Sequence, residues 1–584
     1  MEQEKRRQLI VCCDGTNNNL TGRRNDTNVS QLCELLAPDT QNQLLYYDPG
    51  VGNFGTFPGA TWTEQIQQKW ERLSSLAFGS GIYENIAEAY RFLMRNWREG
   101  DEIFLFGFSR GAFTARSLGG LINTFGVLRP DMDAMVPSLL HVYFLKRDTP
   151  AREDRFNALK SQINELFASG SARAASVWFV GVWDTVESVG APGLFSKEIS
   201  AKATIVGKRF IHVRQALALD EYRYTFAPRP YWIELGYDYA AHGQSIVQEW
   251  FSGSHCDVGG GYANERAGLS AQTLLWMIDQ AASPPCGLRL SPALLDNDEP
   301  DRALIANHLD DRSQQQGPRA RLVHSETYST PWWALAGLTV RDPVVPMKPV
   351  DADIKLARPV ESSAVADAAL EFPKDTVWKT PRAWGWLLFA AFMYGIFATI
   401  AAAFHLGPSS SSAAAVCTLP FVWMNELPPL ASANLCFAQW QLAWWTSGQS
   451  PSTGLIGYHS PNRAVAIDFF IIASYGYLLA RGAGWAFARR AGLRRVGMKP
   501  SKVLNYFGMA PLFAILGDIM ENLLTWATLA VARNSFIPSL EHITGVAMTL
   551  AAATKWLALL ASLALILWGC FVKRDQRDQR PLSG

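Results

Sequence analysis

The stretch Glu102-Ile-Phe-Leu-Phe-Gly-Phe-Ser109-Arg-Gly-Ala112 decides the fold class of this chain. An apolar run of strand length leads directly into Gly107-Phe-Ser-Arg-Gly111, and the residues from Ala112 to Ile122 have the apolar spacing of a helix. A G-x-S-x-G pattern between a strand and a helix is typical of a sharp turn that presents a nucleophilic serine. We therefore predict Ser109 as a nucleophile, with Gly107 and Gly111 permitting the turn. The alternative is an ordinary turn serine.

The segments around this turn repeat the order of strand and helix. Apolar runs bounded by polar residues predict the strands Gln8–Cys13, Glu102–Phe106, Val177–Val182, Phe210–Val213 and Val247–Phe251, and an amphipathic pattern predicts a helix from Ile82 to Trp97. This alternation is typical of an α/β domain in which helices cover a mainly parallel sheet. The expected fold is therefore α/β-hydrolase-like.

A nucleophilic serine needs a histidine base and a carboxylate that orients the histidine. In α/β-hydrolases these partners follow the serine in the order acid, then histidine. Asp184 comes directly after a predicted strand and is the candidate acid, with Glu187 as its rival and a helix N-cap as its alternative role. His255 lies in a glycine-rich loop after the last predicted strand and is the candidate base, whereas His212 lies within an apolar run.

Stabilising the tetrahedral intermediate requires two N–H donors. One is expected from Arg110, directly after the serine, and the other from the early loop Asp14-Gly15-Thr16, through Gly15 or Thr16. An ordinary Asp-Gly turn is the alternative for this loop. Asp14 and Asp257 together could instead belong to a metal site, but no spacing of several oxygen ligands supports one. We predict neither a metal nor a cofactor.

Charge and hydropathy divide the chain. The 53 Lys and Arg residues balance the 52 Asp and Glu residues to a formal net charge of +1, which argues against a nucleic-acid partner. A proline-rich, charged stretch lies between Thr339 and Pro381, so we predict a catalytic domain at 1–338, a linker or surface excursion at 339–381 and a helical domain at 382–584. Four apolar stretches follow, at Ala383–Phe404, Ala464–Ala480, Tyr506–Ala532 and Ile543–Val572.

These stretches approach the length of about 20 residues that crosses a bilayer, and they predict a bundle of about four transmembrane helices. The basic segment from Arg481 to Lys502 predicts that both termini and the hydrolase domain face the cytoplasm of a cell whose inner membrane holds the protein. No signal peptide is expected from the first residues. Buried helices of a large soluble domain are the alternative. Carboxylates inside a membrane face other helices or a water-filled cavity, so Asp468, Asp518 and Glu521 are expected to be packing partners between helices, with a functional role as the alternative.

Several motifs together resemble the catalytic domain of the type VI secretion phospholipase effectors, a bacterial α/β-hydrolase family. They are Cys13-Asp-Gly-Thr-Asn17, Thr27-Asn-Val29, Tyr47-Asp-Pro-Gly-Val-Gly52, Glu84-Asn85, Gly107-Phe-Ser-Arg-Gly-Ala112, Trp183-Asp-Thr-Val186 and His255-Cys-Asp-Val-Gly-Gly-Gly-Tyr262. The resemblance covers roughly Arg7 to Met277. It implies hydrolysis of glycerophospholipid acyl esters by Ser109, Asp184 and His255. It does not settle whether the protein is a secreted antibacterial effector. The partners to expect are a phospholipid membrane and, for an effector, an immunity protein or a secretion-apparatus component.

Three functions remain in view at this point. The leading hypothesis is a phospholipase A-type serine hydrolase that acts at a membrane. The first alternative is a membrane-anchored esterase or thioesterase that acts on soluble esters. The second is a non-enzymatic channel or signalling protein whose hydrolase-like domain binds a ligand, although a complete candidate triad argues against it.

Overall fold

The computed structural model of the chain divides into two compact units. Unit 1 comprises residues 1–221, 225–324 and 341–371, and unit 2 comprises residues 222–224, 325–340 and 372–584. The structure describes residues 6–15, 26–37, 39, 41–50, 80–145, 147, 149–167, 175–186, 205–263, 266–291, 322–324, 326, 338–339, 341, 344–349, 356–359, 369–370, 472, 475–480, 482–484, 486, 508–534 and 538–571.

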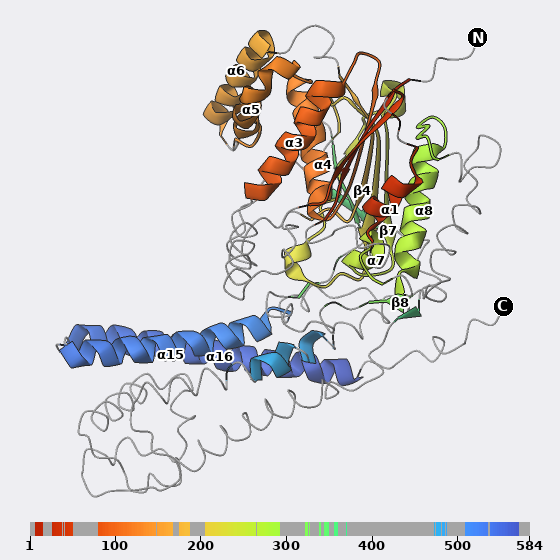
Figure 1. Ribbon diagram of the computed structural model, residues 1–584. Coiled ribbons are helices and arrows are strands. Elements are labelled where there is room, and N and C mark those ends of the chain that lie inside the picture. Colours follow the sequence, from red (N-terminus) through yellow and green to blue (C-terminus); the bar gives the residue numbers. More distant parts are fainter. Residues whose placement is uncertain are drawn as a thin grey trace, which may run out of the picture. The chain divides into compact units, whose positions relative to one another are not determined.

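A six-stranded parallel sheet forms the centre of unit 1 (Figure 1). Its strand order is β2-β1-β3-β4-β5-β7, and each neighbouring pair is parallel. The strands are β1 Gln8–Cys13, β2 Gln43–Asp48, β3 Glu102–Phe108, β4 Val177–Trp183, β5 Phe210–Ala218 and β7 Ser245–Phe251. Because all six run the same way, their carboxyl ends meet at one edge of the sheet, which is where such sheets place their ligands.

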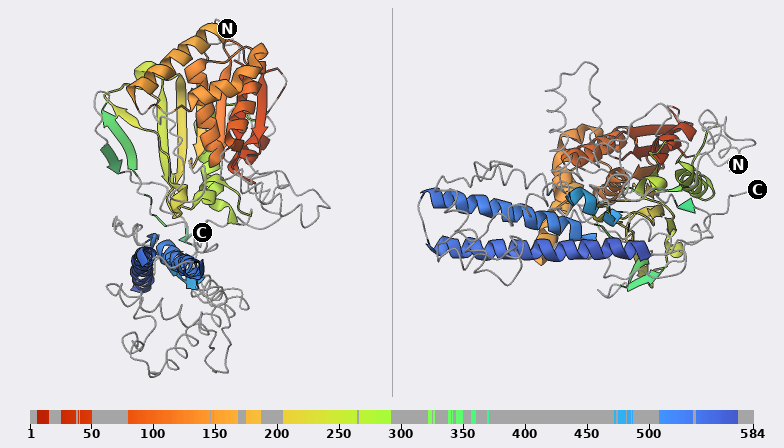
Figure 2. Two further views of the ribbon diagram at one scale, coloured as in Figure 1. Left: turned by 90° about the vertical axis from the view of Figure 1, so that its left-hand side faces the viewer. Right: turned by 90° about the horizontal axis from the view of Figure 1, so that it is seen from below.

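Helices cover both faces of this sheet, because its central strands are apolar on both sides (Figures 1 and 2). One layer contains α3 Ser80–Asn96, α4 Arg110–Phe125, α5 Val136–Tyr143 and α6 Pro150–Phe167. The other contains α1 Asn28–Leu35, α7 His255–Gly259 and α8 Gly268–Ala282. The described short 3₁₀ segments are η1 Pro130–Met135, η3 Tyr224–Phe226 and η4 Ala240–His242.

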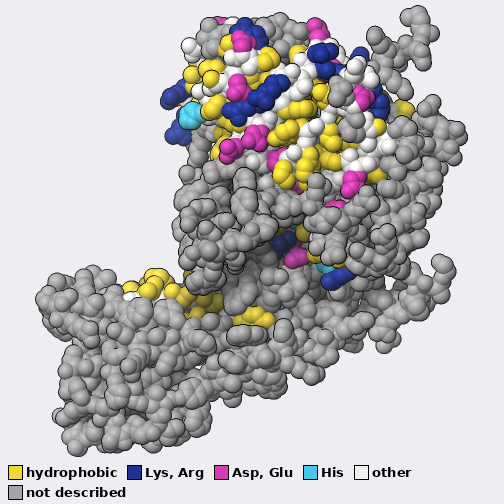
Figure 3. Space-filling model, viewed as in Figure 1, with side chains coloured by type: hydrophobic (Ala, Val, Ile, Leu, Met, Phe, Trp, Pro, Cys, Tyr) yellow, Lys and Arg dark blue, Asp and Glu magenta, His cyan; other side chains and the backbone are white. Residues whose placement is uncertain are grey.

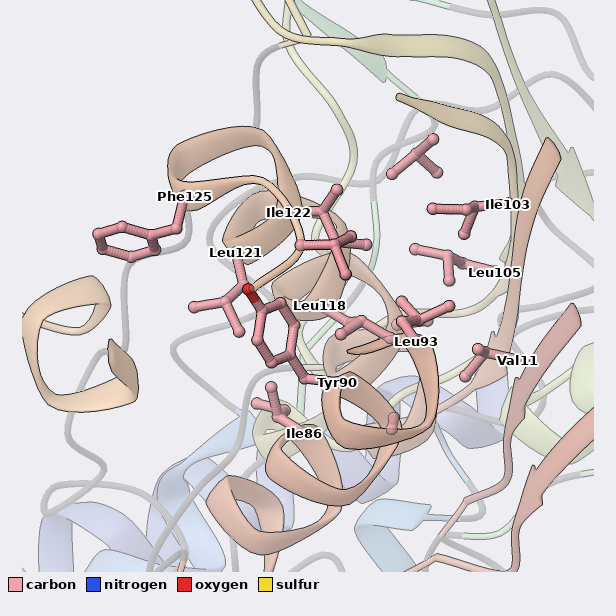
Figure 4. Close-up of a cluster of buried hydrophobic side chains, with 14 of the residues drawn as sticks. Val11, Ile86, Tyr90, Leu93, Ile103, Leu105, Leu118, Leu121, Ile122 and Phe125 are labelled. Carbon is pink, nitrogen blue, oxygen red and sulfur yellow. The ribbon is translucent and has the colours of Figure 1, made fainter. Parts of the chain in front are cut away.

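The core beneath α3 and α4 shows how this packing fixes the element that carries the serine. Figure 4 shows side chains from α3, α4 and two strands interdigitating, among them Ile86, Tyr90, Leu93, Leu118, Leu121, Ile122, Val11, Ile103 and Leu105. All nine are fully buried. The Tyr90 hydroxyl, which would be costly to bury alone, donates to the Gly126 carbonyl at 2.9 Å. The helix after Ser109 is therefore held rigidly against the sheet.

The predicted mainly parallel α/β fold with flanking helices is confirmed for unit 1. Four predicted strands were too short: β3 continues to Phe108, β4 to Trp183 and β5 to Ala218, and β7 begins at Ser245. β5 is longer because its last residues pair with β4 and β7. Two small sheets lie beside the main one. They are formed by β6 Ile233–Leu235, β9 Val344–Pro349 and β10 Leu356–Pro359, and by β8 Leu322–Val323 and β11 Ala369–Leu370.

The described part of unit 2 is dominated by two long helices, α15 Ala510–Asn534 and α16 Pro538–Phe571, which pack side by side (Figure 2). Lys555 on α16 pairs with Asp518 and Glu521 on α15 at 3.2 and 2.8 Å, and the Tyr475 hydroxyl donates to Asp518 at 2.5 Å. Asp518 and Glu521 are thus packing partners between helices. Apolar side chains of both helices are also exposed, and Figure 3 shows part of this surface.

The transmembrane bundle predicted for the C-terminal part is not supported. Within the described residues, no helix combines the length and the apolar character that a bilayer crossing requires. The predicted third and fourth stretches correspond to α15 and α16, and the side chains of Asp518, Glu521 and Lys555 interrupt their apolar sequence. The stretch 383–404, Asp468 and most of the basic segment 481–502 lie outside the described residues.

Candidate active site

Ser109 occupies a strained turn between β3 and α4. Its backbone has φ 59° and ψ −122°, a conformation that side-chain-bearing residues rarely adopt. Among the non-glycine residues that the structure describes, Asp184, with φ 38°, is the only other one at positive φ. Strain of this kind costs about 1–3 kcal/mol and persists where the surrounding structure enforces it, often at functional sites. Both strained residues are members of the predicted triad.

Gly107 and Gly111 permit this turn because a side chain at either position would collide with backbone. A Cβ at Gly107 would lie 2.5 Å from the Gly111 carbonyl oxygen, and a Cβ at Gly111 would lie 2.1 Å from the Cys13 carbonyl oxygen. The start of α4 therefore packs directly on the carboxyl end of β1. The turn is fixed on its other side by the Ser109 amide, which donates to the Trp183 carbonyl at 3.1 Å.

Asp184 and His255 form a buried hydrogen-bonded pair beside this turn. The His255 Nδ1 lies 2.6 Å from Asp184 Oδ2, and both side chains are almost fully buried. The His255 ring lies against Phe108, the residue before the serine, with ring centroids 4.6 Å apart. Three residues that follow β3, β4 and β7 are thus brought to the carboxyl edge of the sheet. Ser109, Asp184 and His255 have the chain order of an α/β-hydrolase triad.

Arg341 is a site residue that the sequence analysis missed. Its Nη1 donates to Asp184 Oδ1 at 2.6 Å and its Nη2 donates to Asp184 Oδ2 at 3.0 Å. Burial on its own would raise the pKa of the Asp184 carboxyl, but Arg341 and His255 hold that pKa well below its ordinary value. Asp184 is therefore a carboxylate, the form that accepts a hydrogen bond from the His255 Nδ1–H.

No local signal pointed to Arg341. It lies 157 residues after Asp184, in the stretch that was interpreted as a linker or surface excursion. The only indication is a general one: a buried carboxylate needs a cation or several hydrogen-bond donors, and an arginine from any part of the chain can supply them.

The rival residues lie elsewhere. His212 pairs in register with Phe179 on β4, four positions before Trp183, or roughly 13 Å along the strand from the carboxyl edge. Its Nδ1 contacts the Ser245 hydroxyl at 2.8 Å, and burial lowers the pKa of its imidazole. His212 is thus a hydrogen-bonded strand histidine. Glu187, the rival of Asp184, lies outside the described residues.

The structure describes two of the three residues predicted to supply oxyanion donors, Arg110 and Gly15. Arg110 is the first residue of α4, where backbone N–H groups have no partner within the helix. The Gly15 amide donates to Asp14 Oδ1 at 2.7 Å, so it would have to leave this bond to reach an oxyanion. Asp14 Oδ2 accepts from the hydroxyls of Thr27 and Tyr47 at 2.7 and 2.9 Å. Thr16 lies outside the described residues.

Asp257 serves a second buried histidine rather than Asp14. Its Oδ1 lies 2.5 Å from His324 Nδ1, and its Oδ2 accepts the amides of His324 and Ser254 at 2.8 and 2.9 Å. Burial raises the pKa of the Asp257 carboxyl despite these bonds. Within the described ranges, no three or more His, Cys, Asp or Glu side chains gather in a way that could hold a metal ion.

One family model matches a large part of this unit. Residues 7–280 match the family model "T6SS, Phospholipase effector Tle1-like, catalytic domain". This match supports a hydrolase activity of the lipase or phospholipase type. It ends before His324 and Arg341, so two residues that reach the site in this chain lie beyond the Tle1-like catalytic domain.

A curated relative matches part of this chain. The chain is 32% identical over 235 residues to "Uncharacterized protein YEL023C" of Saccharomyces cerevisiae, a stretch that covers 38% of this chain and 33% of the yeast protein. The chain thus spans about a third of that relative's length. No solved structure matches the chain significantly.

Proposed function

We propose that this protein hydrolyses acyl esters of glycerophospholipids through a covalent acyl-enzyme. The supporting observation is the coincidence of a strained serine turn with a buried Asp184–His255 pair, in a unit that matches a phospholipase effector domain. A strained backbone and a buried carboxylate each destabilise the folded state, and the buried carboxylate also needs hydrogen-bond donors. A catalytic role for Ser109, Asp184 and His255 explains why these features occur together at one site.

In this proposal the Ser109 hydroxyl attacks the ester carbonyl carbon while its proton passes to Nε2 of His255. Asp184 holds the other ring nitrogen, Nδ1, and stabilises the imidazolium that forms. The tetrahedral oxyanion is bound by the Arg110 amide and by an amide of the Gly15-Thr16 loop. Collapse breaks the ester bond, and the lysophospholipid oxygen takes the proton from His255. Water, deprotonated by His255, then releases the fatty acid and restores Ser109.

The direct test uses full-length protein, phospholipid vesicles and a soluble short-chain ester, with released fatty acid and lysophospholipid measured by mass spectrometry. We expect Ser109→Ala to reduce release from vesicles by at least about a thousandfold, because the nucleophile is lost. Ser117→Ala is the matched control, since Ser117 is a fully buried serine on the same helix. It should retain activity.

The other outcomes separate the alternatives. Cleavage of the soluble ester without lipid release would favour an esterase or thioesterase. Lipid release that persists in Ser109→Ala would show that Ser109 is not the nucleophile. Failure of the wild type on both substrates would favour a non-enzymatic role for the domain.

A further inference from the structure

Arg341 makes more hydrogen bonds at the site than an ion pair with Asp184 alone would need. Its guanidinium is 1% exposed and makes two parallel bonds to the Asp184 carboxylate, the arrangement that fixes a carboxylate in its plane. Its Nη1 also donates to the Ala218 carbonyl at 2.8 Å, and its Nη2 donates to the Phe226 carbonyl. The guanidinium thus ties Asp184 to the end of β5 and to η3.

The hydrogen bonds to Asp184 leave it one orientation. Its Oδ1 accepts from Arg341 and from the Ala218 amide at 3.0 Å, while its Oδ2 accepts from Arg341 and from His255. Without the guanidinium, two of these four bonds disappear, and a buried carboxylate at a strained backbone position keeps only one imidazole and one amide. Rotation of the carboxylate would then move Oδ2 away from His255.

We infer that Arg341 is a positioning residue of the active site, which holds Asp184 toward His255 and offsets its negative charge so that His255 accepts a proton at neutral pH. This inference rests on the proposed function. The physical reason is electrostatic: a lone buried carboxylate stabilises an imidazolium strongly, whereas a carboxylate already paired with a guanidinium stabilises it less. Arg341 therefore tunes how basic His255 is.

Other charged groups around His255 add to this requirement. Glu221 accepts the His255 backbone amide at 3.2 Å, and Asp220 accepts the Gly253 amide at 2.8 Å. Asp257 lies on the same short helix as His255 and is paired with His324. Arg110, at the start of α4, is a partly buried cation, and burial lowers its pKa to about 10. Carboxylates thus bind the backbone at and next to His255, and loss of Arg341 would remove a positive charge from this part of the site.

The position of Arg341 in the chain gives the inference a second support. Residue 341 lies beyond the 7–280 region that matches the catalytic domain model. Three residues later the chain enters β9, which pairs with β6 in parallel and with β10 in an antiparallel manner. This small sheet anchors the segment to the same unit as the triad. The active unit of this protein thus extends past the matched domain.

The test follows Ser109 reactivity as a function of pH in full-length protein. A fluorophosphonate probe bonds to Ser Oγ with loss of fluoride, and it reports the activated nucleophile without any lipid. Rates of labelling and of short-chain ester hydrolysis are measured from pH 5 to 9 for wild type, Arg341→Gln and Arg341→Lys. Arg116→Gln is the matched control, since Arg116 is another buried arginine of unit 1, stacked on Tyr231.

Removal of the positive charge raises the pKa of His255, so the rise of activity with pH in Arg341→Gln should move to higher pH by about one unit. Arg341→Lys keeps the charge but not the planar fork, so its profile should stay near that of wild type while its rate falls about tenfold or more. Arg116→Gln should lower stability without moving the profile.

Two results would overturn the inference. One is an Arg341→Gln profile that is lowered equally at every pH, which is what a purely structural ion pair predicts. The other, which also decides the matter if Arg341→Gln does not fold, is an Arg341→Lys protein equal to wild type in both rate and profile. A wild type that is not labelled at Ser109 would instead refute the proposed function on which the inference rests.

Discussion

Ser109 and Asp184 are held at backbone angles that favour glycine, and this strain is the first prediction at the scale of single residues. Glycine adopts positive φ without a steric penalty, although it adds entropy to the unfolded chain. We expect Ser109→Gly to be more stable than Ser109→Ala by about 1 kcal/mol, since alanine keeps the strain. Thermal and denaturant unfolding of the two inactive variants would measure the difference.

The comparison has a built-in control, because both variants lack the hydroxyl and differ only in the Cβ. Equal stability of the two proteins would mean that the turn stores no appreciable strain. The backbone conformation of Ser109 would then no longer support its assignment as the nucleophile.

The residue scale also shows what a single sequence can and cannot reveal about this site. Ser109 and Asp184 each lie directly after an apolar run, and His255 lies in the glycine-rich loop that follows the last strand, so their signal is local. Arg341 carries no such signal, because its partner lies 157 residues away and no spacing relates the two. His324 likewise carries no local signal, since its pairing with Asp257 spans 67 residues. Contacts of this kind arise from the tertiary fold.

At the scale of elements, the short helix α7 places His255, and Asp257 holds that helix. Ser254 and Asp257 form a capping box, and the buried Asp257 carboxylate also accepts two bonds from His324. Asp257→Asn replaces one acceptor oxygen with a donor that faces other donors. We expect it to destabilise unit 1 by about 1–3 kcal/mol and to reduce Ser109 labelling, because an unsatisfied buried group keeps its full desolvation cost.

Asp39→Asn is the matched control for this prediction. Asp39 also accepts backbone amides, from Gln41 and Asn42, but it is exposed, so water replaces any lost bond. Unfolding curves and labelling rates of the two variants give the comparison. Similar, small effects for both would mean that Asp257 does not secure α7.

Strands and helices were predicted correctly where their sequence patterns are continuous and regular. β1, β3, β4 and α4 are continuous apolar runs or regular amphipathic patterns, and the structure has them within a few residues of the predicted bounds. β2, with the sequence QLLYYD, was missed because it carries polar ends, whereas β1, of the same length, is apolar after its first residue. The apolar C-terminal stretches were interpreted as membrane spans, yet α15 and α16 carry an ion-paired cluster.

At the scale of the whole molecule, the two units have separate hydrophobic clusters, so a change in one core need not disturb the chemistry of the other. Unit 2 also contains Lys555, whose side chain is 9% exposed and paired with two carboxylates. Lys555→Met leaves Asp518 and Glu521 without their cation. Breaking a buried pair by removing one partner typically costs about 3–5 kcal/mol.

We therefore expect Lys555→Met to lower the unfolding temperature and the protease resistance of the α15–α16 pair, while the rate of Ser109 labelling stays near that of wild type. The triple variant Asp518→Asn, Glu521→Gln, Lys555→Met removes the charges together and should recover much of the lost stability, because no carboxylate is then left unpaired. A triple variant as unstable as Lys555→Met would contradict the electrostatic explanation. Loss of labelling in parallel with unfolding of the helix pair would show that catalysis depends on unit 2 as well.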